Sequence, residues 1–273
     1  MNVENPYLPV EAELLDVVEE TPTIKTFVLE PAQPIPFRAG QFMQLTLPGL
    51  GEAPFTPSSS PYEKEEMEIT ILKTGKVTDA LHSLQPGVTL GLRGPFGKGY
   101  PVEKFIGKEI LIVGGGVGLA PLRSLLYYLF QNLDKFKRVS IKYGAKRPEE
   151  LCYRKLYSQW EELKTVDLTV TIDVPAPGWE GRVGLVTTLF DDLDIDLNNC
   201  YVVSCGPEIM LRFVTFKLID SGFAPEQIYL SMNRNMSCGI GKCGRCIIGK
   251  YFLCKDGPDM CYADIKDIPG VFG

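Results

Sequence analysis

Cysteine spacing is the feature that most limits how this 273-residue chain can fold, because five of its eight cysteines lie within the last 36 residues. Cys238, Cys243 and Cys246 share one glycine-rich loop, and Cys254 follows after seven intervening residues. The stretch holds too few apolar residues for a core of its own. Residues 1–10 lack a basic region followed by an apolar one, so no secretory leader points to a disulfide-forming compartment. The crowding therefore indicates metal ligation.

The C-x4-C-x2-C spacing of Cys238, Cys243 and Cys246 is typical of [2Fe–2S] loops. Glycines in such a loop take up positive φ angles and bring backbone N–H groups to the sulfurs. The alternative is a structural zinc site, whose cysteines usually form two separate pairs spaced about two to four residues apart. Three cysteines on one loop favour the cluster. The fourth ligand is either Cys254, which ends an apolar run that can form a hairpin with residues 247–248, or Cys261.

Short β-rich runs separated by Pro/Gly turns occupy residues 10 to about 99, and they predict a small antiparallel barrel. One helix is expected inside it, over residues 78–84, with Thr78 as its N-cap. The predicted strands cover residues 26–30, 41–47, 68–73 and 88–92.

Beyond residue 107 the pattern changes to apolar strands that alternate with helices, which predicts a doubly wound parallel sheet covered on both faces. Such sheets bind ligands beyond the carboxyl ends of their strands, here after Val113, Tyr143 and Ser204. Three domains follow: a barrel over 1–104, an α/β domain over 105–232 and a cysteine module over 233–273. The expected strands are 110–113, 139–143, 168–172, 201–204 and 228–231, and the expected helices are 121–131, 149–163, 186–191 and 208–221.

Composition excludes several classes of function. The formal net charge is −6 and no Lys/Arg run forms a basic patch, which argues against nucleic acid as a partner. No apolar run approaches the roughly 18 residues of a membrane span, so we expect a cytoplasmic protein. His82 is the single histidine, so a Ser-His-Asp triad would have to be built on it.

Two motifs in the α/β part predict a nucleotide site. The strand over 110–113 runs into Gly114, Gly115, Gly116 and Gly118, a turn without side chains where backbone amides can approach a pyrophosphate at a helix N-terminus. The turn departs from G-x-G-x-x-G, and a merely tight strand-to-helix turn is the alternative. Cys205 ends a later strand before Gly206-Pro207 and would face the crevice; its alternative is a buried small hydrophobe, the role that we assign to Cys200 and Cys152.

Two barrel segments are suited to a flavin. Pro54-Phe55-Thr56 and Ser58 place an aromatic ring beside hydroxyl groups, and residues 75–78 begin the predicted helix. A ring can stack on a flavin while a helix N-terminus holds phosphate, although either segment alone is an ordinary turn.

Taken together, these motifs resemble the ferredoxin–NADP reductase superfamily, in that family's order and over nearly the whole chain. They look closest to its electron-transfer subunits with a C-terminal [2Fe–2S] tail: the gamma subunits of NiFe sulfhydrogenases, the B subunits of anaerobic sulfite reductase and the dihydroorotate dehydrogenase electron-transfer subunits. The short gap from Cys246 to Cys254 looks most like the first two.

The resemblance implies that the barrel binds FAD, the parallel sheet binds NAD(H) or NADP(H), and the tail carries the cluster. Cys254 becomes the fourth ligand, since a cysteine just before such an Asp-Gly-Pro segment ligates the cluster in those subunits. The implied flavin contacts are Pro54, Phe55, Thr56, Ser58, Leu72, Gly75, Lys76, Val77 and Thr78. The implied nucleotide contacts are Gly114, Gly115, Gly116, Gly118, Ala120, Pro121, Gly144, Arg147, Cys205, Gly206, Pro207 and Met210.

By the same resemblance, Phe55 stacks on the flavin, Thr56 places its hydroxyl near flavin N5, and Cys205 lies beside nicotinamide C4. Ala53 departs from the family pattern, which has an arginine there that pairs with FAD phosphate. Asn233 stands where relatives often have a carboxylate, so that role is not transferred.

The expected reaction is hydride transfer between nicotinamide and flavin, followed by one-electron steps through the cluster to a redox partner subunit. Two alternatives are a stand-alone NAD(P)H–acceptor oxidoreductase and a non-catalytic, zinc-stabilised binding subunit. Coenzyme choice depends on residues 146–150, where Lys146 and Arg147 favour a 2′-phosphate and Glu149 and Glu150 disfavour it. NADH is slightly preferred.

Overall fold

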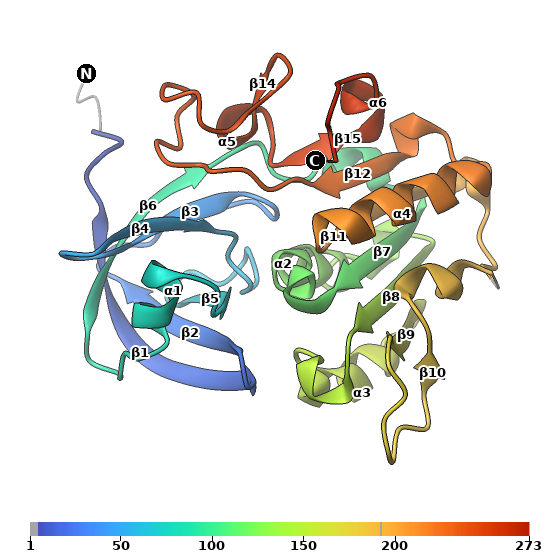
Figure 1. Cartoon of the computed structure of the whole chain (residues 1–273), viewed down its shortest axis with the longest axis horizontal. Helices are drawn as coiled ribbons and strands as arrows, with labels where there is room; N and C mark the ends of the chain where they lie inside the picture. Colours follow the sequence, from blue (N-terminus) through green and yellow to red (C-terminus); the bar gives the residue numbers. More distant parts are fainter. Residues whose placement is uncertain (1–4, 192, 273) are drawn as a thin grey trace.

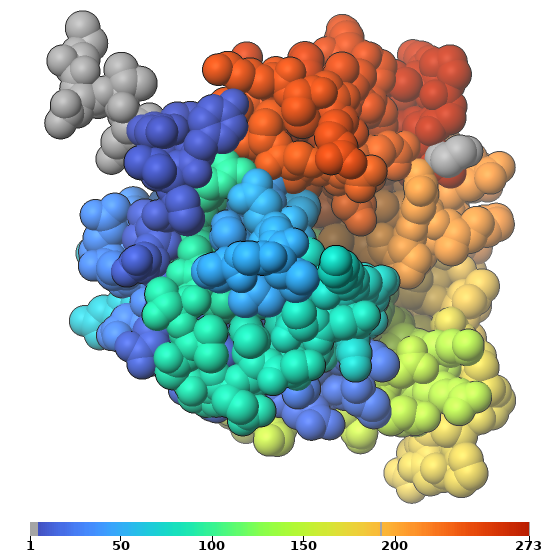
Figure 2. Space-filling view, turned by 60° about the vertical axis from the view of Figure 1, so that its left-hand side comes forward, coloured from blue at the N-terminus to red at the C-terminus, as the bar shows by residue number. Residues whose placement is uncertain are grey.

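Two sheets stand side by side in the computed structural model, which describes residues 5–191 and 193–272, and the C-terminal tail lies across both (Figure 1). The space-filling view shows the tail, in orange and red, over the end of the blue and green N-terminal domain (Figure 2). Among the described residues no helix has the length and apolar character needed to cross a bilayer.

The N-terminal sheet has six antiparallel strands in the order β4-β3-β6-β1-β2-β5. Alternate side chains such as Leu14, Phe27 and Leu45 point inward and are fully buried. The segment after β4 also bonds to β5, because the Ser58 N–H donates to the Glu68 carbonyl at 2.7 Å; this closes the barrel. The elements are β1 (Val10–Thr21), β2 (Ile24–Pro31), β3 (Phe42–Leu47), β4 (Gly51–Phe55), β5 (Met67–Leu72), α1 (Lys76–Leu81) and β6 (Thr89–Phe96).

The second sheet is parallel from β10 to β12 in the order β10-β9-β8-β7-β11-β12, and β15 adds an antiparallel edge. Its strands are β7 (Glu109–Gly115), β8 (Arg138–Ala145), β9 (Val166–Ile172), β10 (Arg182–Val183), β11 (Cys200–Cys205), β12 (Ile228–Ser231) and β15 (Asp259–Cys261). The chain reverses its direction of sheet growth between β7 and β11, the point at which open α/β sheets bind ligands.

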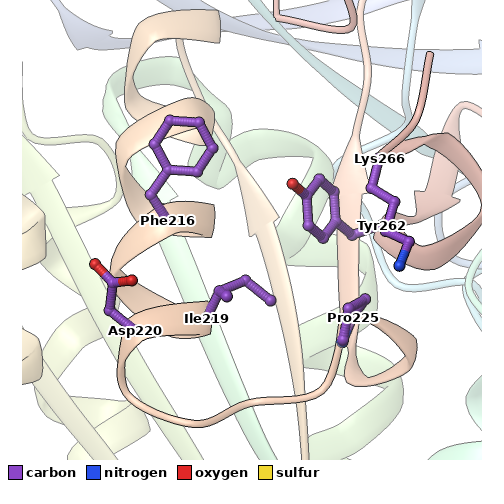
Figure 3. Close-up of a pocket in the computed structure, with 6 residues that line it drawn as sticks. All are labelled: Phe216, Ile219, Asp220, Pro225, Tyr262 and Lys266. Atoms are coloured by element: carbon purple, nitrogen blue, oxygen red, sulfur yellow. The ribbon is translucent and has the colours of Figure 1, made fainter.

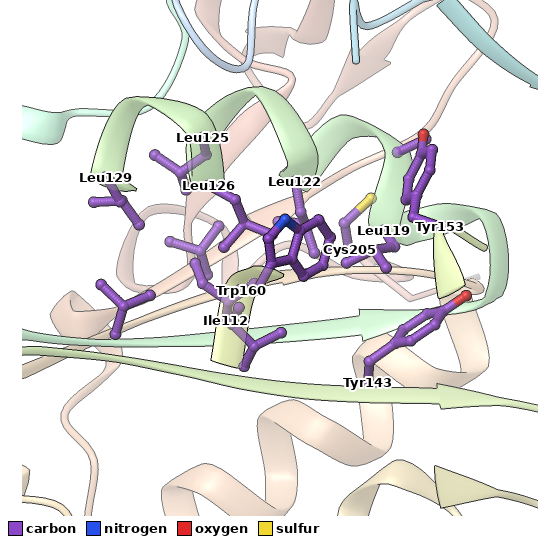
Figure 4. Packing of buried hydrophobic residues seen from close by; sticks show 14 of the residues in the cluster. Ile112, Leu119, Leu122, Leu125, Leu126, Leu129, Tyr143, Tyr153, Trp160 and Cys205 are labelled. Atoms are coloured by element: carbon purple, nitrogen blue, oxygen red, sulfur yellow. The ribbon is translucent and has the colours of Figure 1, made fainter. Parts of the chain in front are cut away.

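Both faces of this sheet are covered, as the apolar runs predict. On β7, Ile110 and Ile112 pack under α2 (Leu119–Phe130), and Leu111 and Val113 pack on the opposite side with α4 (Glu208–Asp220). Figure 4 shows Leu122, Leu125, Leu126 and Leu129 of α2 directed at this sheet. The doubly wound arrangement is confirmed.

The tail is built onto its neighbours instead of forming a separate core. Met236, Ile248, Leu253 and Ile265 are buried in the same cluster as Val113 and Leu230 of the parallel sheet. The predicted hairpin over residues 247–253 is confirmed, since β13 (Ile247–Ile248) pairs with β14 (Tyr251–Phe252). Two short helices, α5 (Leu253–Asp256) and α6 (Tyr262–Ile265), flank β15.

Two helix predictions are wrong. Thr78 is not an N-cap: α1 begins at Lys76, and the Thr78 hydroxyl accepts hydrogen bonds from the N–H groups of Thr74 and Gly75, each at 2.9 Å. The helix expected over 149–163 shrinks to α3 (Tyr157–Glu161), because Tyr153 adopts a left-handed conformation and directs its hydroxyl to Thr70 of the barrel.

Other elements also differ from expectation. The helix expected over 186–191 is a 3₁₀ helix over Val186–Phe190, and strands β1, β4, β10 and β15 were not predicted. The remaining 3₁₀ helices are short connections at Val102–Phe105, Gly116–Gly118, Leu133–Lys135, Pro148–Glu150, Arg154–Leu156, Leu197–Asn199 and Pro225–Gln227, beside Val186–Phe190 itself.

Candidate functional site

The ends of β7 and β11 bring the two predicted nucleotide motifs together, with Gly114 paired to Cys205. A Cβ on Gly118 would lie 2.3 Å from the Cys205 carbonyl oxygen, and one on Gly115 would lie 2.2 Å from Met210 Sδ. Gly118 is therefore required for the close packing of the two loops, because its Cβ would clash with backbone, whereas a Cβ on Gly115 would displace the flexible end of Met210. Gly116 differs, since it has φ +54° and open space where its side chain would be.

The remaining residues of this motif set line the same corner. Ala120 and Pro121 lie in the first turn of α2, and Pro207 precedes α4. A Cβ on Gly206 would meet the Met210 methyl at 2.5 Å, and Gly144 packs against Val186. Sequence-distant segments thus meet at the carboxyl edge of the sheet.

The Cys205 thiol lies among the side chains at the start of α2 (Figure 4) and is 8% exposed. Burial, together with the nearby Asp259 carboxyl, raises its pKa to about 12, against a smaller lowering by hydrogen bonding with Ser231. It is therefore a neutral thiol at physiological pH. We therefore expect the thiol to contact and hydrogen-bond a ligand, and not to act as a nucleophile.

The flavin-motif residues lie on or beside β4, β5 and α1, which contact one another at one surface of the barrel. Phe55 and Val77 are half-buried against the barrel core, and Leu72 packs on the α2 side of the neighbouring domain. Pro54 and Thr56 are also half-buried, whereas Gly75 and Lys76 are exposed at the start of α1. Ser58 lies behind this surface, fully buried, with its hydroxyl 2.9 Å from Thr70.

A buried polar network joins these two surfaces, and sequence reasoning missed it. Arg123 of α2 forms an ion pair with Glu68 of β5, and its guanidinium lies 4.5 Å from the Tyr153 ring centroid. The Tyr153 hydroxyl donates to Thr70 at 2.6 Å. Because Arg123 follows the glycine loop by one turn of helix, the network fixes the nucleotide loop relative to the barrel.

Most of the residues predicted to select the coenzyme are exposed to solvent. Lys146 and Arg147 are exposed after β8, and Arg147 forms a long ion pair with Glu149 at 3.9 Å. Burial raises the pKa of Asp173 after β9, and the nearby Lys146 opposes that shift. Lys146 therefore faces an acidic group that the sequence analysis did not consider.

Four cysteines of the tail gather in two pairs. Cys238 lies within hydrogen-bonding range of Cys243, and Cys254 lies within hydrogen-bonding range of Cys246. In a [2Fe–2S] cluster each iron is bound by two thiolates, which suits two pairs of cysteines. A structural zinc ion is instead bound by all four thiolates around a single centre. Among the described residues, no three His, Cys, Asp or Glu side chains are grouped to hold a single metal ion.

Backbone N–H groups surround these sulfurs, as cluster loops require. Gly241 donates to Cys254 Sγ at 3.2 Å, and Lys242 donates to Cys238 Sγ at 3.3 Å. Burial raises the pKa of Cys238, but N–H groups of the loop outweigh burial and lower it to about 6. Cys261 is directed elsewhere, 3.6 Å from the Glu226 carbonyl of the α/β domain. The four predicted ligands fit a binuclear cluster.

Arg93 fastens this loop to the barrel. Its side chain is 4% exposed, pairs with Glu52 at 2.5 Å and 3.0 Å, and donates to the carbonyl groups of Ser237 and Cys238. In the sequence, the charged residue inside the otherwise apolar run of β6 could have indicated this role. Gln44 adds a second link, since its amide donates to the Met236 carbonyl while its strand pairs with Pro54.

A separate hollow of about 550 Å³ lies between α4 and the tail (Figure 3). Its lining residues are Phe216, Ile219, Asp220, Pro225, Tyr262 and Lys266. None of the predicted cofactor residues lines it.

Two family models and several known proteins match this chain. Residues 13–100 match the oxidoreductase FAD-binding domain, and residues 112–215 match the oxidoreductase NAD-binding domain. The gamma subunit of sulfhydrogenase 1 from Pyrococcus furiosus is 36% identical, with 98% of this chain and 96% of that protein covered. A probable dihydroorotate dehydrogenase B (NAD(+)) electron transfer subunit from Methanocella arvoryzae is 33% identical over 92% of this chain and 89% of its own.

Among solved structures, an NADH-dependent reduced ferredoxin–NADP oxidoreductase is 26% identical, with a TM-score of 0.71 over 94% of this chain and 92% of that one.

Proposed function

Since the chain belongs to the family of FAD- and NAD-binding oxidoreductases that includes the sulfhydrogenase gamma subunits, we propose that it is the electron-transfer subunit of a cytoplasmic redox complex. Electrons pass between NAD(H) or NADP(H), an FAD on the barrel, a [2Fe–2S] cluster and a partner subunit. The relatives' names as complex subunits support a partner here. The proposed domains are 1–104 for FAD, 105–232 for the nucleotide and 233–273 for the cluster.

The position of the tail is the observation that carries this proposal. Its β15 pairs with β12 of the nucleotide sheet, while Arg93 of the barrel bonds to the carbonyl of Cys238. The cysteine loop therefore contacts the flavin-motif half of the molecule through Arg93 and Gln44, and Cys243 is exposed on the molecular surface. A relay from nicotinamide to flavin to cluster to surface needs this order.

The chain's own residues supply binding and alignment in this scheme. FAD, when bound, supplies the chemistry that accepts two electrons together and releases them singly. Phe55 and Thr56 on the barrel and Cys205 on β11 are our candidates to align nicotinamide C4 with flavin N5, which requires a separation of roughly 3–3.5 Å. The other flavin and nucleotide contacts predicted from the sequence remain candidates.

We propose NADH as the preferred coenzyme. Lys146 and Arg147 are the two cations near the expected 2′ position, and Glu149 and Asp173 lie close to them. A 2′-phosphate would meet these carboxylates, whereas a ribose hydroxyl would not be repelled by them.

Anaerobic purification tests the proposal. The protein should show flavin bands and [2Fe–2S] bands in its visible spectrum, with about two irons and two sulfides per chain, and NADH should bleach both sets of bands. Zinc in place of iron would refute the cluster and favour a zinc-stabilised binding subunit. Affinity purification from the native source should bring down a second redox subunit; a lone chain that reduces ferredoxin or dyes would favour the stand-alone oxidoreductase.

A further inference from the structure

A carboxyl group is buried where the barrel, the nucleotide sheet and the tail meet. Asp259 is 9% exposed, begins β15 and pairs with Ser231 at the end of β12. Tyr100, from the segment after β6, bonds to the same Ser231. Gly40, from the loop between β2 and β3, comes so close that a Cβ there would lie 2.2 Å from Asp259 Oδ2. All three parts of the molecule therefore enclose one acid.

Within the part of the chain that the structure describes, one oxygen of this carboxyl has a hydrogen-bond partner and the other has none. The Ser231 hydroxyl donates to Asp259 Oδ1 at 2.6 Å, and the Tyr100 hydroxyl lies 2.8 Å from Ser231 Oγ. Oδ2 is buried and has no partner within residues 5–191 and 193–272. Burial raises the pKa of Asp259 to about 7, against the lowering effect of Ser231 and Tyr100. The group can therefore change its charge near neutral pH.

Asp259 contacts Ser231, which leads toward Cys205, and it also borders a groove that opens to solvent. Ser231, which bonds to it, is also within hydrogen-bonding range of the Cys205 thiol at the end of β11. Asp259 and Tyr100 also line a groove of about 330 Å³ on the molecular surface. The carboxyl thus lies between water and the site where nicotinamide is expected.

We propose that Asp259 is the proton-exchanging group of the hydride-transfer site, gaining its proton from water through this groove and acting on the site through Ser231 and Cys205. The inference rests on the proposed function. A hydride that moves from NADH to the flavin carries two electrons and one proton nucleus, so NADH is oxidised, the flavin is reduced and one negative charge is added there. The Asp259 carboxylate takes up one proton from water, and the overall step consumes NADH and one proton.

The other charged and titratable groups near Asp259 do not account for proton exchange at this site. Besides Asp259, the groove is lined by three cations and three carboxylates: Arg38, Lys98, Lys104, Glu103, Asp256 and Asp264. Their formal charges cancel. Burial raises the pKa of Tyr229 and Cys261, which also line the groove, and of Tyr100 and Cys205, so these groups stay neutral near pH 7. Asp259 is the group among them whose pKa lies near neutrality.

Proton uptake during a single turnover tests the proposal. Holoprotein in weakly buffered solution at about pH 8 is mixed with one equivalent of NADH, and a pH indicator reports protons taken up per flavin reduced. The parent should take up one proton more than Asp259→Asn. Asp264→Asn, an exposed acid on the same groove, is the matched control and should behave like the parent. Equal uptake by the parent and Asp259→Asn would overturn the proposal.

A second measurement needs no reduction and no folded Asp259 variant. The infrared band of a protonated carboxyl should disappear from the parent as the pH rises through about 7, and Ser231→Ala should move that midpoint upward, because it removes the hydrogen bond to Oδ1. An unmoved midpoint, or no such band, would refute the proton role. A parent that binds flavin but is not reduced by NADH or NADPH would instead refute the proposed function.

Discussion

Replacing Asp259 by asparagine should change how the stability of this protein depends on pH. An aspartate has a usual pKa of 3.8, and burial raises it to about 7 in the folded chain. The folded state therefore binds this proton more tightly than the unfolded chain does. Its contribution to stability is fully present at acidic pH and is lost as the pH rises toward 7. The parent should thus weaken with rising pH, and the asparagine variant should lack this part of the weakening.

The size of the effect follows from the two pKa values. Since one pH unit of difference corresponds to about 1.36 kcal/mol, the full penalty for the ionised carboxylate is about 4 kcal/mol. Between about pH 5 and about pH 8, the part that changes is about 3 kcal/mol. Asparagine has a fixed cost of its own, about 1–3 kcal/mol, because its amide N–H groups would be buried without partners. That cost does not vary with pH.

Urea unfolding at several pH values measures this difference. The free energy of unfolding of Asp259→Asn minus that of the parent should rise by about 3 kcal/mol from pH 5 to pH 8. Other titrating groups are common to both proteins and cancel in the subtraction. Asp264→Asn is the control, and its difference from the parent should stay flat. A flat difference for Asp259→Asn would show that this carboxyl is ionised throughout and would refute the reasoning.

Three further predictions use other residues. Cys254→Ser should abolish or strongly alter the EPR signal of the reduced cluster while Cys261→Ser leaves it unchanged, and the reverse pattern would reassign the fourth ligand. Arg123→Met should destabilise the protein by about 1.5–3 kcal/mol, because the partly exposed Glu68 would lose its charged hydrogen-bond partner; an unchanged urea midpoint would contradict this. Cys205→Ala should keep FAD and cluster but slow flavin reduction by NADH, and an equal stopped-flow rate would make Cys205 a packing residue.

The sequence predicts those strands and turns whose structure is set by residues adjacent in the chain. The strands of the parallel sheet are continuous apolar runs because both their faces are covered, so β7 and β11 are found within two residues. The hairpin across Gly249-Lys250 follows from its turn residues and the short apolar runs on each side. The glycine loop after β7 and the turn after β11 are likewise contiguous stretches, so the sequence could place both at the carboxyl ends of these strands.

Contacts between distant segments explain what sequence reasoning missed. Tyr153 breaks the expected helix because its hydroxyl bonds across the domain boundary to Thr70, a contact 83 residues away in the sequence. β15 is three residues long and gains strand geometry only by pairing with β12. Asp259 carries no local signal, since its environment is assembled from Gly40, Tyr100 and Ser231.

Arg93 does not replace the arginine that the family has at the position of Ala53. A guanidinium has five N–H donors. Arg93 directs its donors to both carboxylate oxygens of Glu52 and to the carbonyl groups of Pro6, Ser237 and Cys238. This arginine, close to the flavin-motif strand, is therefore committed to the cysteine loop and has no donor left for an FAD phosphate. Flavin phosphate must then be held without the family's arginine, and we expect FAD to dissociate more readily than the cluster during gel filtration.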